Sequence, residues 1–205
     1  MTRVLIADDH PMIAAAMDVL LRGTEYQVVG RARTGADAIA QVQRESPDIL
    51  LLDVNMPDGS GLDVLADLRS RETAPIVVLL TAGMDDTQLL KADSLAPDGM
   101  VLKTSDPALL LDCMEKVLNG EKWVDPEIAD RTQEVKERVA RAPSLTPRER
   151  ELVDLVRQGL RNRDIAARLG VTEGTVKVYL HAIFDKVGVD NRTELAMRAA
   201  DLLGT

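Results

Sequence analysis

The fold of the first half of this chain is decided by the stretch Ile49-Leu50-Leu51-Leu52-Asp53-Val54-Asn55-Met56-Pro57-Asp58-Gly59. The residues from Ile49 to Asp53 have the length and apolarity of a parallel strand that is buried on both faces. Pro57 and Gly59 then end the strand and begin a loop. Because ligands of open α/β sheets bind beyond the carboxyl ends of the strands, Asp53 lies where such proteins carry out chemistry.

Strand and helix patterns alternate over the first half of the chain. Strands are predicted at residues 4–8, 27–32, 49–53, 76–81 and 100–103. Amphipathic helices are predicted at residues 11–22, 35–45, 61–71, 86–95 and 107–119. Such alternation is typical of βαβ crossovers. We therefore expect an α/β domain with a doubly wound, five-stranded parallel sheet that helices cover on both faces.

Polar residues stand at the carboxyl ends of four of these predicted strands. They are Asp8 and Asp9, Asp53, Thr81 and Lys103. In a doubly wound sheet these ends converge on one edge, where three carboxylates would repel each other. A hard divalent cation with oxygen ligands would neutralise them, and Mg²⁺ suits a phosphoryl group nearby. Lys103 adds a positive charge for phosphate oxygens, and the Thr81 hydroxyl can reach the same oxygens.

Composition indicates a globular protein. The chain has 205 residues, of which 45% are hydrophobic and 29% are charged. No apolar run approaches the roughly 18 residues that a membrane span needs, and the N-terminus lacks a signal-peptide pattern. We therefore expect a cytoplasmic protein without a membrane partner. The single cysteine, Cys113, lies among apolar residues at helical spacing and is predicted to belong to the core.

Charge and pattern divide the chain into two domains and a linker. Residues 1–125 hold 11 Lys and Arg against 21 Asp and Glu, whereas residues 145–205 hold 10 against 9. An acidic first part repels nucleic acid, and a near-neutral last part permits its binding. The predicted domains are residues 1–122 and 145–205. The linker, residues 123–144, is expected to be partly helical and to hold little core, with a thin apolar stripe of Ile128, Val135 and Val139.

The strand-end residues resemble those of the receiver domain of bacterial response regulators. The resemblance covers residues 3 to about 120 and rests on Asp8-Asp9, Asp53, Met56-Pro57, Thr81 and Lys103. It implies a flavodoxin-like fold in which Asp53 accepts phosphate from a sensor histidine kinase, and Thr81 and Lys103 hold the phosphoryl group. The Mg²⁺ ligands that it implies are Asp8, Asp9, Asp53 and the backbone carbonyl of Asn55.

Three positions near this site are unusual or invite another interpretation. The family usually has an aromatic residue three positions before the lysine, where this chain has Met100. A flexible Met can still change its packing, so the resemblance leaves an altered switch open. Pro107 follows Lys103 by four residues, somewhat later than the resemblance implies. His10 invites a catalytic interpretation, but His10-Pro11 is favoured as the beginning of a helix.

The last 60 or so residues show helical periodicity only. Thr146-Pro147-Arg148-Glu149 is a capping box that begins a helix. A second helix is predicted at residues 162–169, followed by a turn at Gly170 and a third helix capped by Thr172. The third helix has a buried stripe at Val176, Leu180, Ile183, Phe184 and Val187, with Lys177, Val178 and His181 on the opposite face. This pattern predicts an all-α, four-helix domain with a helix-turn-helix.

Residues 145–198 resemble the LuxR-type DNA-binding domain. The matching motifs are Leu145-Thr146-Pro147-Arg148-Glu149, Asp164-Ile165-Ala166, Thr175-Val176-Lys177 and Lys186-Val187-Gly188-Val189. The resemblance implies that Lys177, Val178 and His181 face bases and phosphate in the major groove. It also implies that Thr172, Thr175 and Lys186 contact the DNA backbone. Arg161 replaces the family's usual Ser cap, and Asn162 is expected to cap the second helix instead.

Together these features predict a transcriptional regulator of the NarL/FixJ type, not an enzyme. Phosphorylation of Asp53 is expected to make two DNA-binding domains available on promoter DNA. The resemblance implies that the homodimer forms through residues 193–203. Two alternatives stay open. A haloacid-dehalogenase-like phosphohydrolase also forms an aspartyl-phosphate, but it places a second acid where this chain has Asn55. The other is a regulator that binds DNA without phosphate, constitutively or through another partner, and Met100 leaves this alternative open.

Overall fold

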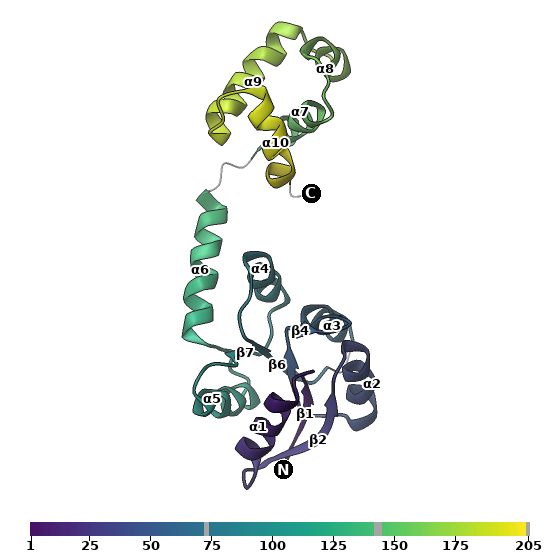
Figure 1. The fold of residues 1–205 in the computed structure, drawn as a ribbon, viewed down its shortest axis with the longest axis vertical. Coiled ribbons are helices and arrows are strands. Elements are labelled where there is room, and N and C mark those ends of the chain that lie inside the picture. The colour runs from purple at the N-terminus through teal and green to yellow at the C-terminus, as the bar shows by residue number, and fades with distance from the viewer. Residues whose placement is uncertain (72–73, 142–144, 204–205) are drawn as a thin grey trace. The chain divides into compact units, whose positions relative to one another are not determined.

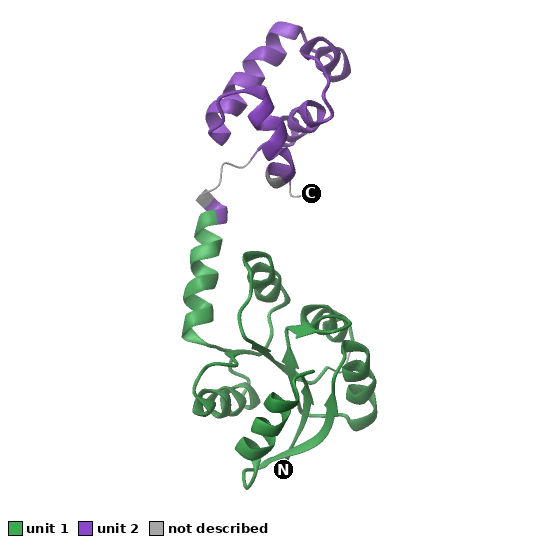
Figure 2. Cartoon of the chain, viewed as in Figure 1, with its two compact units in different colours: residues 1–138 green, residues 139–205 purple. Residues whose placement is uncertain are grey.

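The computed structural model describes residues 1–71, 74–141 and 145–203. Its contacts divide the chain into two compact units, residues 1–138 and 139–205 (Figure 2). Each unit is considered by itself below. No helix in the described ranges is long and apolar enough to cross a membrane.

The first unit is built on a six-stranded parallel sheet (Figure 1). Its strands, in spatial order, are β2 (Tyr26–Ala32), β1 (Thr2–Ala7), β3 (Ile49–Asp53), β6 (Ile76–Thr81), β7 (Gly99–Leu102) and β8 (Trp123–Val124). A separate antiparallel pair is formed by β4 (Asn55–Met56) and β5 (Gly59–Ser60). The predicted doubly wound sheet is confirmed, with the short β8 added at one edge.

Helices cover both faces of this sheet, and the central strand shows why. The helices are α1 (Pro11–Leu21), α2 (Gly35–Glu45), α3 (Gly61–Arg69), α4 (Asp86–Leu95) and α5 (Pro107–Leu118). Leu50 and Leu52 of β3 pack in the core beneath α2, α3 and α4, whereas Ile49 and Leu51 pack in the core beneath α1 and α5. All four side chains are fully buried. A continuous apolar run is what a strand between two cores requires.

Within the segment 123–144, which was expected to be a partly helical linker, residues 126–141 form a continuous helix, α6 (Pro126–Arg141), and residues 142–144 lie outside the described residues. Ile128 and Val135 are buried in the core that contains α4, so α6 contributes more core than the sequence led us to expect. Lys136 also pairs with Asp93 of α4 at 2.7 Å. The remaining member of the predicted stripe, Val139, is 55% exposed.

The second unit consists of α7 (Pro147–Arg157), α8 (Asn162–Leu169), α9 (Glu173–Val187) and α10 (Arg192–Leu203) around one apolar core. Gly170 ends α8 with φ +68°, a left-handed conformation that glycine adopts without strain. The predicted helix-turn-helix pair, α8 and α9, is therefore present. The prediction that Asn162 caps α8 is wrong. Arg161 occupies the cap position without a side-chain hydrogen bond, and Asn162 instead accepts one from Arg192 at 3.0 Å.

Candidate functional site

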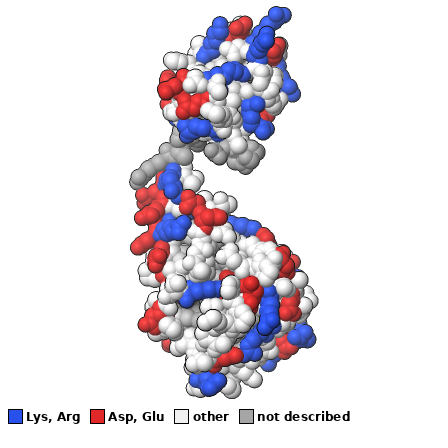
Figure 3. Space-filling model, viewed as in Figure 1, with Lys and Arg blue, Asp and Glu red and all other residues white. Residues whose placement is uncertain are grey.

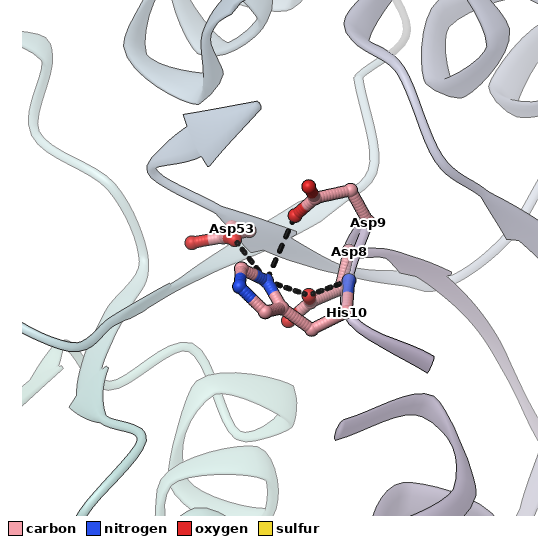
Figure 4. A group of neighbouring side chains, drawn as sticks. All are labelled: Asp8, Asp9, His10 and Asp53. Carbon is pink, nitrogen blue, oxygen red and sulfur yellow. Dashed lines mark hydrogen bonds and ion pairs between the residues drawn. The ribbon is translucent and has the colours of Figure 1, made fainter. Parts of the chain in front are cut away.

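An acidic cluster lies at the carboxyl ends of β1 and β3 (Figure 4). Asp8 follows the last residue of β1 and Asp53 is the last residue of β3, and both are almost fully buried. One ligand atom from each of Asp8, Asp9, His10 and Asp53 lies within 4.8 Å of the others. The parallel pairing of β1 with β3 brings these chain-distant residues together.

Lys103 places a positive charge against the two buried acids. Its Nζ lies 2.8 Å from Asp8 Oδ2 and 2.7 Å from Asp53 Oδ2, and its side chain is only 9% exposed. The residue directly follows β7, and its N–H donates to the carbonyl oxygen of Thr81. Buried charges are stable only when they are paired, so the Lys103 ammonium stabilises the buried Asp8 and Asp53 carboxylates.

The cluster still has oxygen atoms that lack hydrogen bonds. Asp8 Oδ2, Asp9 Oδ1 and Asp53 Oδ2 are buried and accept none from the described residues, although Lys103 pairs with two of them through charge. Three ionised carboxylates and one ammonium leave a surplus of two negative charges. Oxygen donors with this surplus fit a hard divalent cation such as Mg²⁺. The Asn55 N–H donates to Asp53 Oδ1 at 3.2 Å, which places the Asn55 backbone beside the cluster.

Thr81 lies at the same edge of the sheet, where its hydroxyl is hydrogen-bonded to the Gly83 backbone. Its side chain is buried, its hydroxyl donates to the Gly83 carbonyl at 2.8 Å, and it accepts from the Gly83 N–H at 3.0 Å. The structure thus brings Asp8, Asp9, Asp53 and Lys103 into contact distance, with Thr81 on the neighbouring strand β6.

His10 begins α1 as predicted, but the position of its side chain was not foreseen. His10 Nδ1 lies 2.8 Å from Asp9 Oδ1, 3.2 Å from Asp8 Oδ1 and 3.9 Å from Asp53 Oδ2. Its backbone N–H also donates to Asp8 Oδ1 at 2.9 Å. The only sequence indication was that this histidine directly follows two acids.

The loop after Asp53 is fixed at two points that sequence patterns did not reveal. A Cβ atom on Gly61 would lie 2.0 Å from the Asp53 carbonyl oxygen, so only glycine fits at the start of α3. The Gly61 N–H also donates to the Val54 carbonyl at 2.8 Å. Further along, Asp58 accepts from two N–H groups at the start of α2, the closer from Gly35 at 2.8 Å. These hydrogen bonds hold the pKa of Asp58 below its ordinary value.

A buried polar contact joins the segment after Lys103 to the beginning of α6. Asp125 is 3% exposed, and its Oδ2 accepts from the Ser105 hydroxyl at 2.6 Å. Its other oxygen accepts from the Glu127 N–H at 3.1 Å, as a helix cap does. The Asp125 N–H donates to the Met100 carbonyl of β7. Asp125 therefore fixes where α6 begins.

The predicted DNA-reading residues lie on the exposed face of α9. Lys177, Val178 and His181 are all exposed, Val178 by 66%. Thr172 caps the helix by accepting from the Thr175 N–H at 3.1 Å. The structure thus places all five residues at the N-terminal end or on the outer face of α9.

Two lysines on this helix are paired within the unit. Lys177 lies 3.5 Å from Glu173, one turn earlier on α9. Lys186 lies 2.8 Å from Glu149, the acid of the α7 capping box. The Lys186 ammonium, together with the Thr146 N–H, holds the pKa of Glu149 below its ordinary value. The sequence did not predict these ion pairs. In each pair, a glutamate binds a lysine that could otherwise contact a DNA phosphate.

Comparison with known proteins identifies both units. Residues 4–115 match the response regulator receiver domain, and residues 143–199 match the bacterial regulatory proteins of the luxR family. The chain belongs to the response regulators. This regulator is 32% identical over 199 residues to the transcriptional regulatory protein YdfI of Bacillus subtilis (strain 168), covering 95% of this chain and 93% of the relative.

A further relative supports the assignment, and a solved structure shows the same fold. The nitrate/nitrite response regulator NarL of Escherichia coli (strain K12) is 32% identical to this regulator over 200 residues, again covering 95% and 93%. The structure of the RcsB response regulator of Salmonella typhimurium matches with a TM-score of 0.70 over 98% of this chain and all of that chain. Its sequence identity is 24%, so this likeness concerns the fold.

The prediction of a NarL/FixJ-type regulator is therefore confirmed. The family consists of DNA-binding transcription regulators in which phosphorylation-dependent regulation is the norm, and the phosphohydrolase alternative is excluded. The first unit contains the receiver domain, and the second contains the LuxR-type DNA-binding domain.

Proposed function

We propose that this regulator is switched by a phosphoryl group that Asp53 accepts from a sensor histidine kinase. In this proposal Mg²⁺ is held by Asp8, Asp9, Asp53 and the carbonyl of Asn55, while Lys103 and Thr81 bind the phosphoryl oxygens. The observation that carries the proposal is the Lys103 ammonium, which lies 2.7 Å from Asp53 Oδ2 at a buried strand end. One oxygen each of Asp8, Asp9 and Asp53 there accepts no hydrogen bond from the described residues.

The arrangement suits transfer to a carboxylate. An Asp53 oxygen forms the new bond to phosphorus as the bond between phosphorus and the donor breaks, which yields an aspartyl-phosphate. Mg²⁺ supplies charge neutralisation for the carboxylates and the phosphoryl oxygens. Lys103, whose side chain is mostly buried, adds a fixed positive charge beside Asp53. Thr81 would give up its hydrogen bond to the Gly83 carbonyl in order to donate to a phosphoryl oxygen.

Labelling with acetyl phosphate in the presence of Mg²⁺ tests the acceptor. We expect Asp53→Asn to abolish the mass increase of one phosphoryl group. Asp58→Asn is the matched control, since Asp58 lies in the same loop but caps α2 instead of facing Lys103. Undiminished labelling of the Asp53 variant would remove the assignment.

Calorimetric titration with Mg²⁺ tests the metal ligands. We expect a single site whose affinity falls when Asp8 or Asp9 is replaced by Ala, because each substitution removes a carboxylate from the cluster. The Asp58→Asn protein again serves as a control with one acid fewer. Unchanged Mg²⁺ affinity in both alanine variants would exclude their role as ligands.

For DNA we propose that the N-terminal half of α9 enters the major groove. Lys177, Val178 and His181 would face base edges and phosphate, and Thr172, Thr175 and Lys186 would contact the backbone. Support comes from the exposure of the first three side chains and from the position of both threonines at the helix start. The N–H groups of a helix N-terminus are also suited to phosphate.

Binding isotherms at several salt concentrations separate the two kinds of contact. If Lys177 reads a base, Lys177→Ala should cost about 1–3 kcal/mol on the specific site and narrow the gap to random DNA. Lys186→Ala should weaken both DNAs alike and reduce the salt slope by about 0.9. Glu173→Gln should tighten binding, because it releases Lys177 from its partner on α9. A Lys177→Ala protein with unaltered affinity and selectivity would show that α9 does not read DNA in this way.

We further propose that the active form is a cytoplasmic homodimer on promoter DNA, joined through residues 193–203. Met197 of α10 is 73% exposed, and an apolar residue on that surface suits a contact between two copies. Light scattering and DNA titration with and without beryllofluoride, a phosphoryl mimic, test the switch. Tighter DNA binding and dimer formation with the mimic are expected. Equal DNA affinity in both conditions would support a regulator that works without phosphate, in keeping with Met100 at the usual aromatic position.

A further inference from the structure

We propose that His10 is a nitrogen ligand of the receiver's metal site and gives it a preference for divalent transition-metal ions over Mg²⁺. The inference rests on the carboxylate site proposed above and adds a ligand of another chemical class. Imidazole is a good ligand for transition ions, whereas Mg²⁺ favours oxygen. The consequence would be a regulator whose phosphorylation site also responds to the metal that occupies it.

The geometry carries the inference first. Figure 4 shows the His10 ring turned towards Asp9, Asp8 and Asp53, with Nδ1 as the nearest ring atom. Nδ1 and one oxygen of each acid lie within 4.8 Å of one another, the span within which one ion can contact all four. Lys103 contacts Asp8 and Asp53 through their Oδ2 atoms, and His10 lies nearest to Asp9, which Lys103 does not contact in the described structure.

The His10 side chain does not cap the helix that it precedes. His10 occupies the N-cap position of α1, where Ser, Thr, Asp or Asn would accept from the helix, yet it makes no side-chain cap hydrogen bond. Its backbone is fixed on both sides, by the N–H donated to Asp8 and by Pro11 at the first helical position. The ring is therefore held over the acids while 63% of the side chain stays exposed.

Charge supports the same conclusion. Asp8 Oδ2, Asp9 Oδ1 and Asp53 Oδ2 accept no hydrogen bond from the described residues. Lys103 neutralises only one of the three negative charges. A divalent cation balances the remainder. A neutral imidazole then adds a donor atom without adding charge, which a fourth carboxylate could not do.

The composition of the chain makes the test unusually direct. The protein has two histidines, His10 and His181, so a tag-free preparation contains two imidazoles. Pulsed electron paramagnetic resonance of bound Mn²⁺ detects an imidazole nitrogen that coordinates the ion. We expect this nitrogen modulation in the wild type and in His181→Ala, and its loss in His10→Ala. His181 lies on α9 of the other unit and serves as the matched control.

Calorimetry supplies the second readout. We expect His10→Ala to lower Co²⁺ affinity about tenfold or more while changing Mg²⁺ affinity much less, because metal sites lose such factors even when an outer partner of a ligand is removed. Circular dichroism of the variant should match the wild type, since His10 caps nothing.

Three outcomes would overturn the inference. If Mn²⁺ binds without nitrogen modulation and Asp9→Ala lowers the Mn²⁺ affinity, the carboxylate site is supported and His10 is not a ligand. If His10→Ala raises Mg²⁺ and Co²⁺ affinity equally, His10 is a counter-cation that competes with metal. If neither ion binds the wild type, the proposed Mg²⁺ site fails as well.

Discussion

Ser105→Ala should destabilise the receiver domain although it removes only one hydroxyl. The Ser105 hydroxyl donates to Asp125 Oδ2 at 2.6 Å, and Asp125 is 3% exposed. After the substitution this carboxylate oxygen loses its donor where water has little access. Leaving a buried polar group without its partner costs about 1–3 kcal/mol, and the charged acceptor places the expected loss in the upper half of that range.

Urea unfolding followed by tryptophan fluorescence measures this loss in the full chain. Trp123 is the only tryptophan, is buried in β8 and lies two residues before Asp125, so its signal follows the receiver transition. With a slope of about 2 kcal/mol/M, a loss of about 2 kcal/mol moves the midpoint by roughly 1 M.

Ser94→Ala provides the matched control for this experiment. The Ser94 hydroxyl donates to the Lys91 carbonyl on the exposed side of α4, where water can replace it. Its stability should stay within about 0.5 kcal/mol of the wild type. Equal midpoints for Ser105→Ala and Ser94→Ala would refute the view that the bond to Asp125 holds α6 in place.

Other substitutions test the loop and the core. Gly61→Ala should cost the receiver about 1–3 kcal/mol in urea unfolding, since its Cβ would lie 2.0 Å from the Asp53 carbonyl, whereas Gly174→Ala, with no atom closer than 3.7 Å, should be neutral or stabilising. Asp58→Asn should lower the melting temperature at pH 7. The lowered pKa of Asp58 means that its ionised form stabilises the fold at pH values above its ordinary pKa of 3.8. The difference in melting temperature between the variant and the wild type should therefore disappear as the pH falls through the lowered pKa. Burial raises the pKa of Cys113 to about 12, so iodoacetamide at pH 8 should label it only after unfolding, as mass spectrometry would show.

The placement of the acidic cluster was predictable because a parallel sheet imposes it. Once residues 49–53 are assigned to a central strand, the carboxyl ends of its neighbours must meet at the same edge. Asp8, Asp53 and Lys103 could therefore be grouped from their positions alone, and the structure places Lys103 Nζ within 2.8 Å of an oxygen of each acid. The DNA-facing side of α9 was predictable for a similar reason, since helical spacing fixes which residues oppose the buried stripe.

Contacts between loops were not predictable in this way. Ser105 and Asp125 are 20 residues apart, and no periodicity relates a loop hydroxyl to a helix cap. The close approach of Gly61 to the Asp53 carbonyl likewise depends on how the loop folds back. For α6 the sequence showed a thin stripe, but how far it is buried depends on the surface that α4 and β7 offer. Ile128 and Val135 are buried in that core, whereas Val139 is exposed.

The ion pairs in the DNA-binding domain explain why one copy should bind DNA weakly. Residues 145–205 hold 10 basic and 9 acidic residues, so the surplus of positive charge is small, and Figure 3 shows both signs on the visible face. Lys177 and Lys186 are in addition paired with Glu173 and Glu149. Each phosphate contact by these lysines must first replace an internal partner, which reduces the electrostatic gain that usually dominates affinity. Two linked domains on one DNA would double the number of contacts while losing translational freedom only once. The difference in affinity between one domain and two would therefore let a phosphorylation-dependent dimer control DNA binding.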